Sequence, residues 1–285
     1  MKPRAGDKFL INKNLIVSHR RRYDKMKPAA HYHNTLEVFL LVKGKCEFFV
    51  NDNVYKMKPG GIVLIDEYNL HKAVVKEKDF VYERFIIYLN HEYVHRELFK
   101  VIQNFKPANI FSGEISVLHI NDVQLKEVVE LFENIILEQN EKKDGYKTII
   151  KGALMKLFVL LYRRIQKVKE EGNQYLSYDD RRLQEIIQYL NNNYKRSIGL
   201  QKIADKVCLN KHYLCNYFKN KTGFTVIEYI NHKRIVEAQK LLESTSRSIT
   251  DISFSVGFNS LTHFDRVFKE IAGITPSEFR KIKKN

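Results

Sequence analysis

The N-terminal part of the chain consists of short apolar runs separated by turn residues. Runs rich in Val, Ile, Phe and Tyr cover Glu37–Val42, Cys46–Val50, Ile62–Ile65 and Phe80–Leu89. Glycine, proline and asparagine stand between them, and these residues favour tight turns. Short, closely spaced strands with such turns predict a small β-sandwich or β-barrel.

The period of the apolar positions changes near residue 122. Apolar residues at three- and four-residue steps over Val123–Ile136 predict an amphipathic helix that Asn121 or Asp122 can cap. A polar interruption at 140–145 precedes a second helical pattern over Ile149–Ile165. We expect a helical hairpin with broad apolar faces, one in contact with the barrel and another in contact with a partner chain. Alternatively, both apolar faces could be core within the domain. The polar stretch 167–178 is predicted to be a linker.

The strongest internal pattern is a repeat at an offset of 50 residues. Each copy reads F-K-x-x-x-G-x-T-x-x-E-aromatic, at Phe218–Tyr229 and again at Phe268–Phe279. The glycine can end a helix in the left-handed conformation, and the Thr and Glu can begin the next helix with a capping box. Pro276 would occupy the first position of the last helix, where proline is favourable.

A shorter helix and a turn precede each copy. The short helices are predicted at 200–207 and 249–256, and the second turn is one residue longer than the first. Asn210 and Ser260 (or Asn259) can cap the following helices. Their expected buried sides are Tyr213, Leu214, Tyr217 and Phe218 in one copy, and Phe264, Val267 and Phe268 in the other. Two such units predict two helix-turn-helix motifs, with an ordinary helical bundle as the alternative.

A helix over about Thr225–Leu242 is expected to connect the two motifs. At 1.5 Å per residue, about 18 residues span roughly 27 Å. A rod of that length could hold two recognition helices about one DNA turn apart, roughly 34 Å, in successive major grooves.

The faces of the two recognition helices opposite their apolar sides carry the residues that we expect to meet double-stranded DNA. They are Lys211, His212, Cys215, Asn216 and Lys219 in the first helix, and Leu261, Thr262, Asp265, Arg266 and Lys269 in the second. Arg266 suits guanine, Asn216 suits adenine, and Asp265 could accept from cytosine or orient Arg266. Sequence-independent attraction to phosphates is expected from Lys233, Arg234, Arg280, Lys281, Lys283 and Lys284.

Net charge agrees with a polyanionic partner. The chain carries a formal charge of +16, and from Asn173 onward 19 basic residues outnumber 11 acidic ones. The three cysteines form no C-x-x-C pair, and no apolar run is long enough for a signal core or a membrane span. These features predict a soluble, cytoplasmic protein without membrane association.

Residues 198–280 resemble the DNA-binding domain of the AraC/XylS family of transcription regulators. The match to that family's signature runs through Ile252, Gly257-Phe258, Phe264, Phe268-Lys269, Gly273, Thr275-Pro276 and Phe279-Arg280. The resemblance implies that His212, Asn216, Thr262 and Arg266 stand where the family reads bases. It also implies an activator or repressor with a cupin sensing domain, often for sugar-use, stress or virulence genes.

Two positions depart from the family pattern. Cys208 stands where the first turn usually has Gly, at a cost of about 1 kcal/mol if its backbone is left-handed. Ser253 replaces a small Ala and could add a hydrogen bond.

The N-terminal segment also resembles the cupin motifs, through His31, His33 and Glu37, then Gly44, Pro59, Gly61 and His71. In metal-dependent cupins three His and one Glu hold an ion, and such a donor set suits Fe, Mn, Zn or Ni. We favour a pocket without metal or cofactor, in which His31, His33, Glu37 and His71 bind a small-molecule effector such as a sugar.

The resulting prediction is an α+β multidomain chain. A cupin-like β-barrel occupies 1–118, a dimerising αα-hairpin 119–172, and an all-α domain with two helix-turn-helix motifs 173–285. The predicted function is a non-enzymatic, homodimeric transcription regulator that binds DNA and an effector and could contact RNA polymerase. The alternatives are a metal-dependent cupin enzyme fused to a DNA-binding module, or a barrel that acts through partner contact alone.

Overall fold

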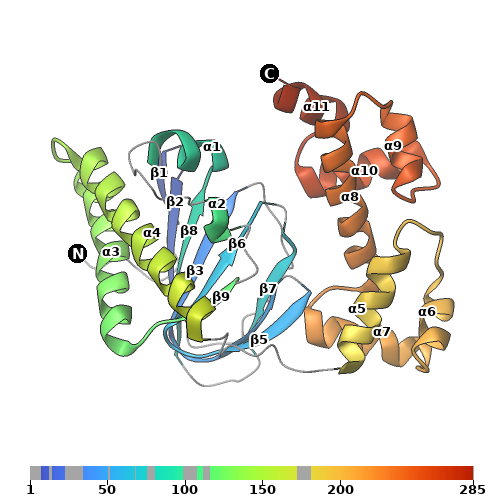
Figure 1. The fold of residues 1–285 in the computed structure, drawn as a ribbon, viewed down its shortest axis with the longest axis horizontal. Helices are drawn as coiled ribbons and strands as arrows, with labels where there is room; N and C mark the ends of the chain where they lie inside the picture. Colours follow the sequence, from blue (N-terminus) through green and yellow to red (C-terminus); the bar gives the residue numbers. More distant parts are fainter. Residues whose placement is uncertain are drawn as a thin grey trace. The chain divides into compact units, whose positions relative to one another are not determined.

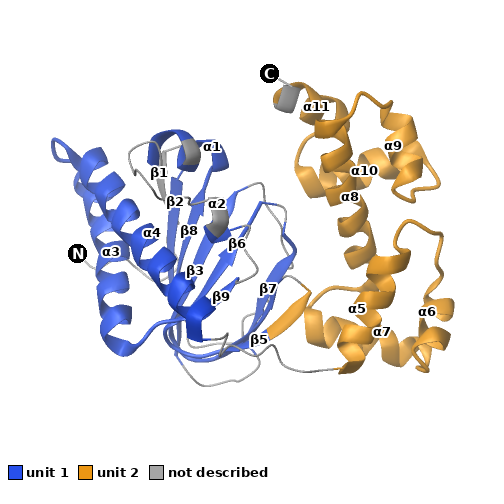
Figure 2. Cartoon of the chain, in the orientation of Figure 1, with its two compact units in different colours: residues 1–29, 34–51, 55–178 blue, residues 30–33, 52–54, 179–285 orange. Residues whose placement is uncertain are grey.

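The computed structural model describes residues 8–12, 15–22, 35–50, 52–67, 69–75, 81–98, 108–111, 116–171 and 181–284. The chain forms two compact units, coloured separately in Figure 2. The first consists of residues 1–29, 34–51 and 55–178, and the second of residues 30–33, 52–54 and 179–285.

Antiparallel strands make up the sheet part of the first unit (Figure 1). The strands are β1 (Lys8–Asn12), β2 (Leu15–Arg22), β3 (Leu36–Lys43), β4 (Cys46–Val50), β5 (Asn53–Met57), β6 (Gly61–Ile65), β7 (His71–Val74), β8 (Tyr82–Leu89) and β9 (Val117–His119). One sheet has the order β1-β2-β8-β3-β6-β9, and the other the order β5-β4-β7. The tight turn before β6 requires Gly60, because a Cβ there would lie 2.4 Å from the carbonyl oxygen of Ile120.

Alternation along the strands separates two apolar cores. In β3, Val38 and Leu40 belong to a cluster shared with the helical hairpin, whereas Phe39 and Leu41 belong to a cluster shared with the second sheet. Successive side chains of a strand point to opposite faces, so a run that is buried throughout must be covered on both sides. The six-stranded sheet is therefore the middle layer of the first unit.

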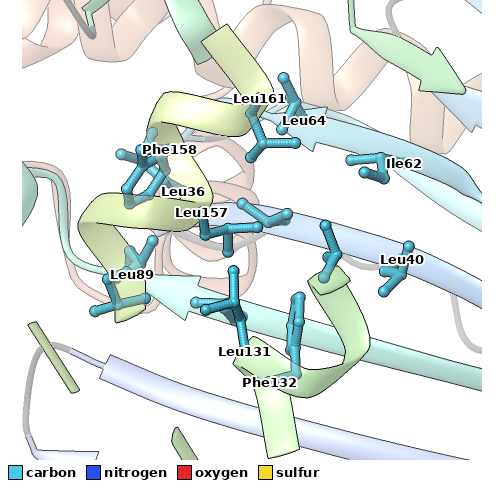
Figure 3. Packing of buried hydrophobic residues seen from close by; sticks show 14 of the residues in the cluster. Leu36, Leu40, Ile62, Leu64, Leu89, Leu131, Phe132, Leu157, Phe158 and Leu161 are labelled. Atoms are coloured by element: carbon cyan, nitrogen blue, oxygen red, sulfur yellow. The ribbon is translucent and has the colours of Figure 1, made fainter. Parts of the chain in front are cut away.

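The helical hairpin consists of α3 (Asp122–Glu141) and α4 (Tyr146–Glu171). Asn121 caps α3 in a reciprocal capping box with Gln124. Figure 3 shows Leu131 and Phe132 of α3 and Leu157, Phe158 and Leu161 of α4 packed with leucine and isoleucine side chains of the sheet. Burying each of these large side chains contributes about 1.5–3 kcal/mol, so this contact stabilises the hairpin on the sheet.

The remaining helices are short in the first unit and make up most of the second. They are α1 (His91–Tyr93), the π-helical η1 (Val94–Leu98), α2 (Ala108–Phe111), α5 (Arg181–Asn193), α6 (Leu200–Lys206), α7 (Lys211–Thr222), α8 (Val226–Ser244), α9 (Ile249–Ser255), α10 (Leu261–Ala272) and α11 (Pro276–Lys284). Among the described residues, no helix is both long and apolar enough to cross a membrane.

The structure confirms the predicted fold class, corrects one predicted boundary, and contains strands β1, β2, β5, β7 and β9, which the sequence interpretation did not include. The predicted strands correspond to β3, β4, β6 and β8 within two residues. Residues 167–171, expected to begin a linker, are helical, because α4 continues to Glu171. Val168 extends the buried stripe of α4, and Lys167 pairs with Glu171 one turn further on. Residues 172–180 lie outside the described part of the chain.

Candidate nucleic-acid interface

The first helix-turn-helix consists of α6, a four-residue turn and α7. The helices α6 and α7 contact each other, and Ile203 and Ala204 of α6 and Leu214 and Phe218 of α7 are fully buried. The side chain of Asn210 accepts a hydrogen bond of 3.0 Å from the backbone N–H of Tyr213, which fixes the start of α7. The predicted cap and the predicted short turn are confirmed here.

The second motif repeats this construction in α9, a five-residue turn and α10. Ile252, Val256, Phe264 and Phe268 are fully buried, α9 and α10 contact each other, and Ser260 caps α10. Ser253 is fully buried and donates to the carbonyl oxygen of Thr250 at 2.8 Å. The residue that departs from the family pattern therefore packs and satisfies its hydroxyl inside its own helix.

The repeated glycine, threonine and glutamate have the predicted roles. Gly223 and Gly273 end the recognition helices with φ angles of 81° and 77°. Thr225 and Glu228 form a capping box that begins α8, with hydrogen bonds of 2.6 and 3.1 Å. Thr275 and Glu278 repeat it, and hydrogen bonds from Thr275 lower the pKa of the Glu278 carboxyl. Each recognition helix is thus set by local chemistry at both ends.

The two turns use the left-handed backbone differently. Cys208 has a φ of 53° in the first turn, and Gly257 a φ of 102° in the second. The Cys208 side chain is exposed, so the first turn tolerates a Cβ at the expected backbone cost. At Gly257 a Cβ would lie 2.5 Å from the carbonyl oxygen of Lys195. The second turn therefore packs against the backbone of the loop that follows α5.

Arg234 of α8 reinforces this contact between the two halves of the second unit. Its Nε donates to the carbonyl oxygen of Tyr194 at 2.7 Å, and its Nη2 to that of Arg196 at 2.9 Å. The guanidinium lies 5.4 Å from the centroid of the Phe258 ring. The loop before the first motif and the turn of the second are therefore held together by one side chain, in addition to the helix α8.

The ten residues predicted to face DNA lie at the surface of their helices. Leu261 and Cys215 are half-buried, and the others are exposed. In α7 the amide of Asn216 lies 3.2 Å from Nδ1 of His212, so the two side chains sit together one turn apart. In α10 the Arg266 guanidinium is 3.5 Å from the Glu270 carboxylate.

One expectation for a side chain near this surface is corrected. Tyr213, expected on the buried side of α7, is 47% exposed and stacks on Tyr217, because it lies one position outside the buried Leu214 stripe. Arg234 and Arg280 donate to backbone carbonyls inside the unit, and their attraction to phosphates stays a prediction. The position of Tyr213 on its helix determines its exposure, whereas the acceptors of the two long arginine side chains depend on the folded structure and cannot be identified from the sequence.

A surface hollow marks the start of α7. It has a volume of about 520 Å³ and is lined by Gln201, Asn210, Lys211, His212 and Cys215. Three of these are predicted DNA-facing residues. Gln201 of α6 was not predicted to line this surface, because the sequence analysis used only the apolar positions of its helix. Its exposed amide near the start of the helix is a signal that could have identified it.

The cupin-like residues are only partly described. Glu37 of β3 and His71 of β7 are both buried, and Oε2 of Glu37 lies 3.3 Å from Nε2 of His71. Burial alone would lower the pKa of His71, but the charge and hydrogen bond of Glu37 and a 2.8 Å contact with the Asn69 carbonyl raise it. His31 and His33 lie outside the described residues. Within the described ranges, no three His, Cys, Asp or Glu side chains are grouped to hold a metal ion.

Comparison with known proteins identifies both parts of the chain. Residues 5–158 match the model of the AraC-like ligand binding domain, and residues 203–282 match a helix-turn-helix domain. Among curated relatives, the uncharacterized HTH-type transcriptional regulator YdiP of Escherichia coli (strain K12) is 25% identical over 92% of this chain and 84% of its own length. The HTH-type transcriptional activator RhaR of Mannheimia succiniciproducens is 24% identical over 95% of this chain and 94% of its own length.

A third relative supports the same assignment. The HTH-type transcriptional activator RhaS of Yersinia pestis (strain Pestoides F) is 24% identical over 88% of each chain. The ligand-binding model covers more than half of the sequence, and the two helix-turn-helix motifs follow it in the same chain. The protein is therefore a transcription regulator of the AraC family, with an N-terminal ligand-binding domain and a C-terminal DNA-binding domain.

Proposed function

We propose that α7 and α10 enter successive major grooves of an operator and read its sequence directly. The observation that carries this proposal is the pair of exposed polar helices, built with the same caps and joined through one helix. The 19 residues of α8 span about 28 Å at 1.5 Å per residue. That length approaches the roughly 34 Å between equivalent grooves on one face of B-DNA.

Individual roles follow from side-chain chemistry. Arg266 donates in bidentate fashion to guanine, and Asn216 pairs with adenine. The Arg266–Glu270 pair is exposed on both sides, and such pairs contribute little, so the guanidinium can exchange the carboxylate for a base. Lys219 and Lys269 lie near the ends of their helices and contact phosphates, which adds affinity without sequence information.

Affinity measurements on DNA selected from a random pool test these roles. Arg266→Ala should lower the affinity by about 1–3 kcal/mol and relax specificity at one base position. Lys219→Ala should weaken all sequences alike and reduce the salt slope by about one. Lys240→Ala is the control, because it removes the same charge from an exposed position of α8. Equal losses on all sequences for Arg266→Ala would contradict base reading.

We propose further that the hairpin forms a homodimer interface. A hollow of about 380 Å³ lies on its outer side, lined by Glu127, Met155, Lys156, Val159, Leu160 and Arg163. Val123 is 78% exposed on the same side of α3 as Glu127, four residues away. The hollow is lined by apolar residues together with charged residues of both signs. Such a surface suits a self-complementary contact, in which each copy of the chain presents the same patch.

Analytical ultracentrifugation tests the dimer. Val159→Glu places a charge in the hollow, and it should shift the protein to monomer and weaken binding to a full operator. Ile227→Glu is the control, since it charges an exposed isoleucine of the DNA-binding unit instead. A dimer that survives Val159→Glu unchanged would contradict this part of the proposal.

We propose that a small molecule bound in the β domain controls DNA binding, and that the protein activates transcription through contact with RNA polymerase. A ligand can do this only if it binds one arrangement of the protein more tightly than another. Relatives described as activators support the sign of regulation. Transcription in vitro with purified polymerase tests it, and repression at the selected operator would reverse the sign.

One observation favours the alternative of a metal-dependent enzyme, namely the contact between Glu37 and His71. Elemental analysis of the purified protein decides between the two. Stoichiometric metal that is lost in His31→Ala would favour the enzyme, and its absence in the wild type would favour the sensor.

A further inference from the structure

The two helix-turn-helix motifs lie toward opposite ends of α8 (Figure 1). Helix α8 contacts α7 of the first motif and α9, α10 and α11 of the second. Each motif has buried apolar residues of its own, so its internal structure does not depend on the other motif. The separation and the angle between α7 and α10 therefore depend on the helix α8 and on any second connection between the motifs.

The loop before the first motif provides such a second connection. Residues 194–199 join α5 to α6, and the carbonyl oxygen of Lys195 would lie 2.5 Å from a Cβ at Gly257. The backbone of this loop is therefore in direct contact with the turn of the second motif. The ammonium group of Lys195 lies 3.6 Å from the carboxylate of Glu237 on α8, which places the loop beside α8 as well.

Arg234 of α8 bonds to this loop and contacts the turn at the same time. The side chain is half-buried. Its hydrogen bonds of 2.7 and 2.9 Å go to the carbonyl oxygens of Tyr194 and Arg196, and its guanidinium lies 5.4 Å from the centroid of the Phe258 ring. Hydrogen bonds from a charged donor are stronger than neutral ones, and a planar guanidinium donates to two acceptors in fixed directions. Arg234 therefore constrains the orientation of the loop as well as its distance.

Phe258 extends these contacts to the second recognition helix. Its ring is buried and lies edge-on to two rings of α10, at 5.3 Å from Phe264 and 5.4 Å from His263 between centroids. On the other side, the Arg196 carbonyl belongs to the loop that leads directly into α6 at Leu200. Direct contacts therefore run from the start of the first motif through Arg234 to α10.

We infer that Arg234 is the positioning residue that holds the two recognition helices at one separation and angle, and so determines which operator spacing the protein accepts. One added base pair moves a DNA site by about 3.4 Å along the axis and rotates it by about 35°. Two modules on a rigid connection cannot both bind after such a change, whereas a looser connection lets both bind. The inference rests on the proposed entry of α7 and α10 into successive grooves.

Affinities for operators of altered spacing test this role in the full-length protein. One base pair is inserted or deleted between the two base clusters of the selected operator, at constant salt. The wild type should lose about tenfold or more in affinity for either change, whereas Arg234→Ala should lose less than about threefold from its own affinity for the unaltered operator. A purely structural loss would instead lower the affinity for every spacing by the same factor.

Arg234→Lys separates the two-acceptor contact from the charge. Lysine keeps the positive charge and the long stem but lacks the planar fork, so this variant should also tolerate the altered spacings. It carries the test if Arg234→Ala does not fold. Wild-type strictness in Arg234→Lys would overturn the inference, because charge alone would then explain the effect. Strictness in Arg234→Ala equal to that of the wild type would overturn it as well.

Arg280→Ala is the matched control. The Arg280 side chain also donates to a backbone carbonyl, that of Arg247 at 2.6 Å, but Arg247 lies between α8 and α9 and Arg280 lies in α11. The substitution removes the same charge and a similar hydrogen bond without touching the loop before the first motif. It should keep the spacing strictness of the wild type, and tolerance equal to that of Arg234→Ala would overturn the inference.

Distance measurements without DNA distinguish this inference from the proposed function. Spin labels at Asn220→Cys of α7 and Phe254→Cys of α9, both exposed, are placed in a chain whose Cys208 and Cys215 are replaced by serine. Pulsed electron paramagnetic resonance should give a narrow distance distribution, and a broader one once Arg234→Ala or Arg234→Lys is added. Equal widths would overturn the inference alone. A wild type that binds every spacing equally would overturn the two-groove proposal and, with it, this role of Arg234.

Discussion

Gly257→Ala is the substitution that most sharply tests how the two DNA-binding motifs are held together. The added Cβ would lie 2.5, 2.8 and 2.9 Å from the carbonyl oxygen, carbonyl carbon and Cα of Lys195. Each of these is a backbone atom, so the turn of the second motif must move away from the loop after α5. The φ of 102° adds strain that an alanine would bear even in open space.

The magnitude follows from these two contributions. Left-handed backbone costs a residue with a Cβ about 1–2 kcal/mol, and forcing an atom into a packed contact costs about 1–3 kcal/mol. We therefore expect Gly257→Ala to destabilise the DNA-binding unit by about 2–5 kcal/mol. Arg234 would lose alignment with Tyr194, Arg196 and Phe258, so affinity for the operator should fall further than the stability loss explains.

Gly273→Ala is the matched control. Gly273 also has a positive φ, of 77°, but a Cβ there would meet nothing within 4 Å. It should therefore show the backbone strain of about 1–2 kcal/mol alone. Urea denaturation followed by circular dichroism gives both stabilities, and hydrogen exchange locates the loss to α9–α11. The reasoning would be refuted if Gly257→Ala cost no more than Gly273→Ala.

Three further predictions concern single side chains. Cys208→Gly should stabilise the DNA-binding unit by up to about 1 kcal/mol in urea denaturation, because glycine adopts the φ of 53° without a Cβ; a loss of stability would contradict this. Gln239→Leu should stabilise it by about 1–3 kcal/mol, since both amide atoms of Gln239 are buried without a hydrogen-bond partner in the described residues; destabilisation would show that the amide is used. The pKa of His71 is higher in the native β domain than in the unfolded chain, so the Glu37–His71 pair contributes its full stability below about pH 6.5 and loses it as the pH rises through the native pKa. His71→Gln should flatten this pH dependence of the thermal unfolding midpoint, and an unchanged pH profile would refute the prediction.

Local chemistry made the DNA-binding unit largely predictable. The glycine, threonine and glutamate of each repeat act within a few residues of one another, so their spacing in the sequence defines the helix ends. The buried stripe of α10 was also predictable, because Phe264, Val267 and Phe268 follow the helical period. Tyr213 was misplaced because adjacent helical positions differ by only about 100° in direction, which a short apolar run does not resolve.

The β domain was harder to predict from sequence. Strands β1 and β2 were missed since Lys8–Asn12 and Leu15–Arg22 mix apolar and basic residues, and their pairing with β8 connects positions far apart in the chain. The pairing of Arg20 with Arg84 follows from that register alone. The hydrogen bonds of Arg234 could not be predicted from the sequence either, because their acceptors are backbone carbonyls 38 and 40 residues away.

The most direct test of two base-reading helices on one rod is an affinity scan over every single base-pair change of a selected operator. The wild type should show two sensitive clusters within each half-site, with centres about one turn, or roughly 10 base pairs, apart. Asn216→Ala should flatten one cluster and Arg266→Ala the other. A single cluster, or two variants that flatten the same one, would contradict the account.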